Sequence, residues 1–219
     1  MDIVISNANV TQVAADLLVL KHAEGFHGAD RAVAEAVGFE EHLKAGEAKF
    51  WSGGGIAASE VLFIGVGPLV EFRYEQIQKF GSEAVKLARL HPKPVRHLVL
   101  TMHGCGYGLD VEQAFLSLLA GIVTDWRTTR SDLTKITIAE LSPKRSELLK
   151  RVLQQALERF GLKEGATPQS AIVSSEQADP PSIVVHFGAR AEDKPRLFAA
   201  MPFADNFLDE FHIGFCEAA

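Results

Sequence analysis

The stretch Arg96-His-Leu-Val-Leu-Thr-Met-His-Gly-Cys-Gly-Tyr-Gly108 decides the fold class of this chain. Residues 97–102 form a short apolar run with β-branched members, which is typical of a buried strand. Three glycines then follow within five residues, at positions 104, 106 and 108. Asp110 can cap a helix, and residues 112–123 carry apolar side chains at helical spacing. The stretch therefore predicts a strand, a glycine loop and a helix in succession.

The same alternation of strands and helices continues on both sides of this unit. Further strands are expected at 2–6, 15–20, 61–66 and 135–141, and further helices at 31–37, 74–90 and 144–160. Residues 1–160 are therefore expected to form one α/β domain with a central mixed, mostly parallel sheet flanked by helices. Residues 161–181 are rich in Gly, Pro, Ser and Gln and are interpreted as a linker, and 182–219 as a strand–helix segment.

Two of the expected strands end in loops that carry glycines. Glycine lets backbone N–H groups approach a ligand closely, and N–H groups at a helix start suit a phosphate. Ligands in such folds usually lie beyond the carboxyl ends of the strands. We therefore expect a ligand site made of Val66, Gly67, Pro68, Gly104, Cys105, Gly106, Tyr107 and Gly108. The alternative is a tight turn that binds nothing, with His103 beside it either donating to a phosphate or lying in solvent.

The composition argues against several classes of function. The formal net charge of −6 and the lack of a long basic run disfavour nucleic-acid binding. Cys105 and Cys216 lack metal-type spacing, and no histidine pair has the HExxH spacing, so neither a metal nor another cofactor is expected. This cysteine usage indicates a reducing cytoplasm. No signal peptide is recognised, and no apolar run approaches the roughly 20 residues of a membrane helix.

Four segments, in order, resemble the macro domain family. Asn9-Val-Thr11 with residues 15–19 is similar to the family's start, where "DIT" precedes "VDAIV", and residues 25–33 resemble its "GGGGVDGAI" segment. Residues 61–68 resemble "VIHTVGP", and 103–108 resemble "STGIYGYP", the loop that cradles the distal phosphate and ribose of ADP-ribose. The resemblance implies the macro-like three-layer fold over residues 1–160 and an ADP-ribose-type nucleotide as the ligand.

The chain departs from that family at positions with chemical roles. Asn9 stands where an aspartate accepts the adenine amino group, and its carbonyl oxygen can still accept a hydrogen bond. Leu20-Lys-His-Ala23 replaces the "NAAN" asparagines on which the family's hydrolases rely. Asp30 is retained, either as a ligand-binding residue or as a helix N-cap. The resemblance therefore implies nucleotide binding by Asn9 and Asp30 without a catalytic residue.

The same region resembles the amino-terminal domain of leucyl aminopeptidases at least as well. The similar segments are 43–47, 60–67, 77–88 and 112–121, followed by Trp126. That domain has the macro fold and serves assembly, and the zinc-binding catalytic half of those enzymes has no counterpart here. This second resemblance implies an alternative function, a structural or oligomerisation module that binds no nucleotide.

Residues 196–219 resemble the opening of bacterial Toll/interleukin-1-receptor-like domains. The shared features are a strand ending in Ala200-Met-Pro-Phe203 and a helix after it. The catalytic glutamate of that family lies further along the chain and is absent. The expectation is a truncated Toll-like second domain, regulated by the nucleotide-binding module in NAD-linked bacterial defence. The alternative is a strand and helix that complete the chain's own fold.

Overall fold

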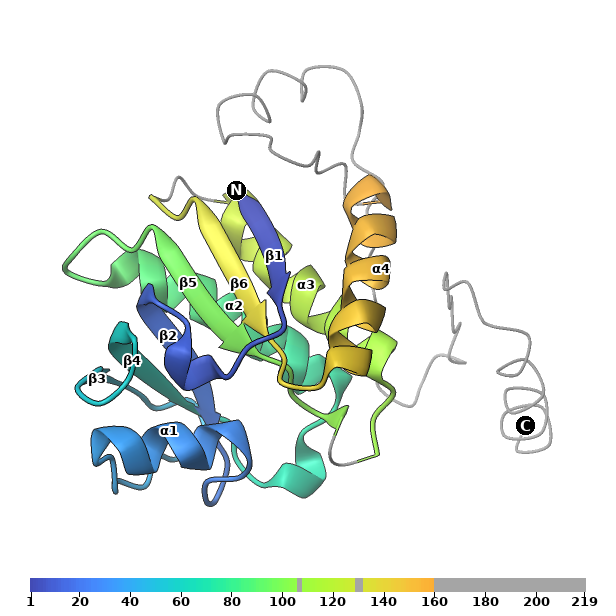
Figure 1. Cartoon of the computed structure of the whole chain (residues 1–219). Coiled ribbons are helices and arrows are strands. Elements are labelled where there is room, and N and C mark those ends of the chain that lie inside the picture. Colours follow the sequence, from blue (N-terminus) through green and yellow to red (C-terminus); the bar gives the residue numbers. More distant parts are fainter. Residues whose placement is uncertain (106–107, 129–131, 160–219) are drawn as a thin grey trace, which may run out of the picture. The chain divides into compact units, whose positions relative to one another are not determined.

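The computed structural model of the chain describes residues 1–105, 108–128 and 132–159 (Figure 1). The strands are β1 (Asp2–Ser6), β2 (Ala15–His22), β3 (Ala48–Ser52), β4 (Ala58–Gly65), β5 (His97–Thr101) and β6 (Lys135–Ala139). The helices are α1 (Ala29–Val37), α2 (Tyr74–Leu90), α3 (Val111–Thr128) and α4 (Pro143–Arg159), with short 3-10 turns η1 (Val10–Gln12) and η2 (Leu69–Glu71). The expected linker, the expected Toll-like segment, Gly106 and Tyr107 lie outside the described residues.

The described strands form one sheet in the order β1-β6-β5-β2-β4-β3. Each neighbouring pair is parallel except β3 and β4, which are antiparallel. The expected α/β class with a mixed, mostly parallel sheet is therefore confirmed. The sequence had not predicted β3, an edge strand whose residues are half-buried or exposed.

Alternation along the strands places apolar side chains on both faces of the sheet. In β2, Leu17 and Val19 belong to the core cluster that includes residues of α2, α3 and α4. Leu18 and Leu20 belong to the other cluster, with Val33 of α1. The three layers are thus α1, the sheet, and the layer of α2, α3 and α4 (Figure 1).

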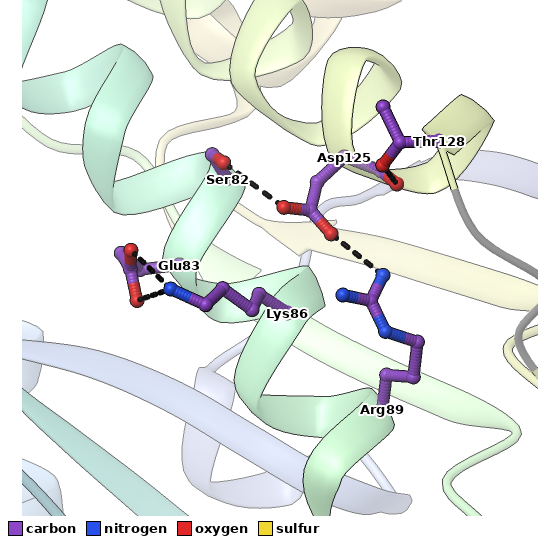
Figure 2. Close-up of polar contacts among 6 residues, drawn as sticks. All are labelled: Ser82, Glu83, Lys86, Arg89, Asp125 and Thr128. Carbon is purple, nitrogen blue, oxygen red and sulfur yellow. Dashed lines mark hydrogen bonds and ion pairs between the residues drawn. The ribbon is translucent and has the colours of Figure 1, made fainter.

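Helices α2 and α3 approach each other closely at two glycines. A Cβ atom on Gly81 would lie 2.6 Å from the carbonyl oxygen of Leu118, and one on Gly121 would lie 1.9 Å from that of Gln78. Beside this crossing, Asp125 of α3 accepts hydrogen bonds from Arg89 at 2.8 Å and Ser82 at 3.2 Å, both on α2 (Figure 2). At this crossing the two backbones pack directly against each other, because no side chain separates them.

None of the helices in the described part of the chain is both long enough and apolar enough to cross a membrane.

Candidate functional site

The parallel strands end together along one side of the sheet, which we call the carboxyl edge. It is made by the ends of the five parallel strands and by what directly follows each of them, and these strands end at Ser6, His22, Gly65, Thr101 and Ala139. Both glycine-bearing loops lie at this edge, as the sequence predicted. They are separated by β2, which pairs with β4 on one side and β5 on the other.

The glycines of these loops have different surroundings. Gly67, Gly104 and Gly108 all have positive φ, at 78°, 92° and 84°, a conformation that other residues rarely adopt. A Cβ on Gly104 would lie 2.8 Å from Leu109 and 3.0 Å from Ile77, so this glycine is packed against the core. A Cβ on Gly108 would meet nothing within 4 Å. Gly108 therefore faces open space.

The first loop continues the sheet before it turns. The N–H of Val66 donates to the carbonyl oxygen of His22 at 2.9 Å, so it is already used in pairing with β2. Pro68 has no N–H and precedes η2. Of the three residues expected here, Gly67 is the one whose backbone conformation is unusual.

Asn9 is exposed, and its side-chain oxygen is engaged within its own turn. It accepts from the N–H of Thr11 at 3.1 Å and from the Thr11 hydroxyl at 3.0 Å, which holds η1. A carbonyl oxygen has two lone pairs, so these two bonds fill it. What Asn9 can offer a ligand in this arrangement is the N–H donors of its amide.

Asp30 forms a buried ion pair with Lys21, and both side chains are only 4% exposed. Asp30 is the second residue of α1, and Gly28 is the N-cap, so the alternative of an Asp30 N-cap is wrong. Burial raises the pKa of Asp30, while the neighbouring Lys21 opposes that rise. Oδ2 meets Lys21, and Oδ1 is buried without a hydrogen bond.

His103 is buried, contrary to the alternative that it lies in solvent. Its ring meets Phe80 and Phe72 edge-on, at centroid distances of 4.8 and 6.3 Å. Burial, and next the charge of Lys21, hold the pKa of His103 well below its ordinary value of 6.5. His103 is therefore neutral at pH 7, and its Nε2 is buried without a partner.

Cys105 is half-buried beside this histidine. Burial raises the pKa of the Cys105 thiol, and the nearby Arg145 opposes the rise only in part. The reactive form of cysteine is the thiolate, so a raised pKa makes the thiol a poor nucleophile. In the described part of the chain, no three His, Cys, Asp or Glu residues are placed to hold a metal ion.

Most of the buried side-chain N and O atoms without a hydrogen bond, among the described residues, lie at the carboxyl edge, and the others lie in the helices α1 and α4 that follow it. They are Nδ1 and Nε2 of His22, Oδ1 of Asp30, Oγ1 of Thr101, Nε2 of His103 and Oγ of Ser146. Leaving such an atom unpartnered costs about 1–3 kcal/mol, so they are rare in the interior of a protein. Their concentration at one edge marks it as the functional candidate in this fold.

No family model and no curated protein matches this chain, but solved structures do. A macrodomain of Oceanobacillus iheyensis with ADP matches at a TM-score of 0.59 and 18% identity, over 71% of this chain and 91% of that one. A Trypanosoma brucei macrodomain in complex with ADP-ribose matches at 0.58 and 20% identity, over 69% of this chain and 68% of that one. This chain has the macrodomain fold.

The macrodomain fold brings to the carboxyl edge several side chains that sequence reasoning had not assigned to the site. They are Lys21, Thr101, Glu140, Arg145 and Ser146. The sequence does carry a signal for Lys21, because it directly follows the apolar run of β2, where a charged side chain would be buried. The sequence carries no such signal for the other residues, because their positions at the carboxyl edge depend on tertiary packing.

One measurable consequence of this arrangement is a loss of stability in mild acid. The unfolded chain protonates His103 near pH 6.5, whereas the folded chain resists protonation. The contribution of His103 to the free energy of unfolding is therefore fully present above pH 6.5 and is lost as the pH falls below it. Urea unfolding at pH 7.5 and 5.5 should show that the wild type loses about 1.4 kcal/mol more than His103→Phe. His22 and His97 shift in the same direction in both proteins and cancel. Equal losses in the two proteins would contradict the buried, neutral His103.

Proposed function

We propose that this chain binds a nucleotide of the ADP-ribose class at the carboxyl edge and does not turn it over. The observation that carries the proposal is the set of buried, unpartnered polar atoms at this edge, next to glycines in positive-φ conformations. A ligand with hydroxyl and phosphate oxygens supplies the partners that such atoms lack. The macrodomains of the same fold whose structures contain ADP or ADP-ribose support this class of ligand.

The proposal includes no turnover because neither Asp30 nor Cys105, among the described residues of this edge, is an activated group. Asp30 is the retained carboxylate of the resemblance, and Lys21 holds it in a buried ion pair. A general base must reach the proton it removes, and a paired, buried carboxylate does not. The thiol of Cys105 is kept protonated by burial.

The test is a calorimetric titration of the wild type and two glycine variants with ADP-ribose. Gly108→Leu places a side chain into the open space at the carboxyl edge, and we expect binding to weaken by at least tenfold, about 1.4 kcal/mol. Gly38→Leu is the matched control, because Gly38 has φ of 67°, equally open surroundings, and a place at the far end of α1. The control should bind as the wild type does. Equal affinities in all three proteins would show that the ligand does not bind next to Gly108.

A specific observation favours the alternative of a structural module. Side-chain oxygens of Asn9 and Asp30 already interact with partners within the chain, Asn9 with Thr11 and Asp30 with Lys21. Oxygens engaged in this way are less available to a ligand, which favours a structural or oligomerisation module over a nucleotide-binding one. If ADP-ribose gives no heat at millimolar concentration while light scattering shows a homo-oligomer, this alternative replaces the nucleotide proposal.

The proposal extends to the segment outside the described residues. Its resemblance to the start of a Toll-like domain supports a role for nucleotide binding in regulating an attached effector, in NAD-linked bacterial defence. The experiment is to join residues 1–219 to a complete Toll-like domain and measure NAD consumption with and without ADP-ribose. Unchanged consumption across the binding range would reject the coupling.

A further inference from the structure

We infer that two copies of this chain pair through the outer side of β1 and form a symmetric dimer whose sheet continues from one copy into the other. β1 is the last strand of the sheet and, among the described strands, pairs with β6 alone (Figure 1). Both glycine loops follow strands on the far side of β6, so the inference concerns a different surface and does not depend on nucleotide binding.

The backbone of β1 carries hydrogen-bonding groups that its neighbour β6 does not use. The N–H of Asp2 donates to the carbonyl oxygen of Thr134 at 2.8 Å, so Asp2 faces β6. In a parallel pair only every second residue of a strand faces the neighbour, so Ile3 and Ile5 direct their N–H and carbonyl groups outward. These groups form a template on which another strand can pair.

The side chains of β1 leave one face of this strand open. Ile5 is buried in the core cluster that includes α4, and Ile3 packs against the same cluster. Side chains alternate along a strand, so Val4 points to the opposite face. There Val4 is 41% exposed, although it is the middle residue of the strand. An exposed apolar side chain on an open edge strand favours pairing with another strand.

The two edges of the sheet differ in how they resist such pairing. Edge strands that stay unpaired usually carry a lysine, a proline or a bulge. The edge strand β3 carries Lys49, which forms an ion pair with Glu41. β1 has the sequence Asp-Ile-Val-Ile-Ser, without lysine or proline, and its pairing with β6 is continuous from Asp2 to Ser6. β1 therefore has the features of a strand that is paired on both sides.

A second copy of β1 fits this side because the strand is complementary to itself in the antiparallel direction. With Val4 on the two-fold axis, Ile3 lies opposite Ile5 of the second copy, and these two residues exchange N–H···O=C bonds. Val4 then faces Val4 of the second copy in a non-hydrogen-bonded pair, where side chains are closest. Asp2 lies opposite Ser6 of the second copy, so no like charges face each other. The same patch serves both copies, as a two-fold dimer requires.

The antiparallel arrangement keeps both candidate ligand sites accessible. The strands of the two copies run in opposite directions, so their carboxyl edges lie at opposite ends of the joined sheet. The junction is short, because β1 has five residues. A small interface of this kind favours a weak and reversible dimer.

The test is sedimentation equilibrium of the full chain at concentrations up to about 1 mM, where a millimolar dissociation constant is still detected. The wild type should dimerise as its concentration rises. Val4→Lys places two cations side by side on the axis and should weaken the dimer by about tenfold or more. Val4→Thr keeps the β-branched shape and should dimerise nearly as the wild type does. Val70→Lys is the matched control, because Val70 is 74% exposed and lies in η2, and it should leave the dimer unchanged.

A disulfide tests the geometry of the junction. Across a non-hydrogen-bonded pair the Cα atoms are about 4.5 Å apart, which is within the range that a disulfide spans. Oxidised glutathione should therefore join two copies of Val4→Cys, and peptide mapping should find the bond at position 4 rather than at Cys105 or Cys216. Val70→Cys is the matched control and should form no more cross-linked dimer than the wild type.

Each outcome supports or rejects the pairing of two β1 strands. A dimer that weakens in a folded Val4→Lys and cross-links at position 4 supports the inference. A wild type that stays monomeric up to about 1 mM overturns it. A dimer of equal strength in Val4→Lys also overturns it, because another surface then joins the copies. If the monomer shows slow hydrogen exchange at the amides of Ile3 and Ile5, the same chain covers β1 itself, and the inference is rejected.

Discussion

Gly121→Ala is expected to destabilise the chain by about 3 kcal/mol or more, although alanine is the best helix former. The new methyl group would lie 1.9 Å from the carbonyl oxygen of Gln78 and 2.9 Å from the N–H nitrogen of Ser82. Both contacts are backbone atoms, so no side chain can turn aside, and α2 and α3 must move apart. Separation also weakens the bonds from Arg89 and Ser82 to Asp125 (Figure 2). Urea unfolding followed by circular dichroism measures the loss.

Thr124→Ala is the matched control for this prediction. It adds the same residue to the same helix at an exposed position, where surface substitutions usually change stability by less than 0.5 kcal/mol. A Gly121→Ala protein as stable as the control would show that α2 and α3 do not meet at the described distance. A loss confined to Gly121→Ala would establish the close crossing as a determinant of the fold.

The parts of the fold that could be predicted are those with a local pattern. Residues 74–90 were predicted as a helix with the bounds that α2 has, because its apolar face repeats at helical spacing and prolines follow it. Asp110 was predicted as a cap and does accept from the N–H of Gln113 at 2.9 Å. β3 was not predicted, because its residues are only partly buried and it forms a strand by pairing with β4. Its antiparallel direction is a property of the whole sheet, not of its own sequence.

The candidate site was predictable only in part, for a similar reason. The glycine loops could be placed at one edge, because parallel strands end on the same side. His103 could not be judged, since its burial depends on Phe72 and Phe80, which reach it from other parts of the chain. The pairing of Lys21 with Asp30 depends on where α1 begins relative to the end of β2. Side chains at this edge are therefore defined by tertiary packing.

Removing the cation of the buried pair is expected to be the most damaging single charge change in the described part of the chain. Lys21→Met keeps the length of the side chain and leaves Asp30 as an uncompensated carboxylate that is 4% exposed. Breaking a buried pair in this way typically costs about 3–5 kcal/mol, measured as free energy of unfolding. Lys150→Met is the matched control, since it breaks an exposed pair with Glu147 and should cost less than about 1 kcal/mol.

The double variant Lys21→Met/Asp30→Leu separates the cost of the unpaired charge from the value of the pair. Replacing both partners by apolar residues is often neutral, so most of the lost stability should return. The single variant also has a pH signature. Without Lys21, the effect of burial on Asp30 is opposed only by the charge of His27. The folded pKa of Asp30 therefore lies further above the ordinary 3.8, and the folded protein binds the proton more tightly than the unfolded chain. Its deficit relative to the wild type should therefore be smaller at pH 4.5 than at pH 7.5. A deficit that grows in acid, or a double variant no more stable than Lys21→Met, would mean that the charge of Asp30 is not what the lysine compensates.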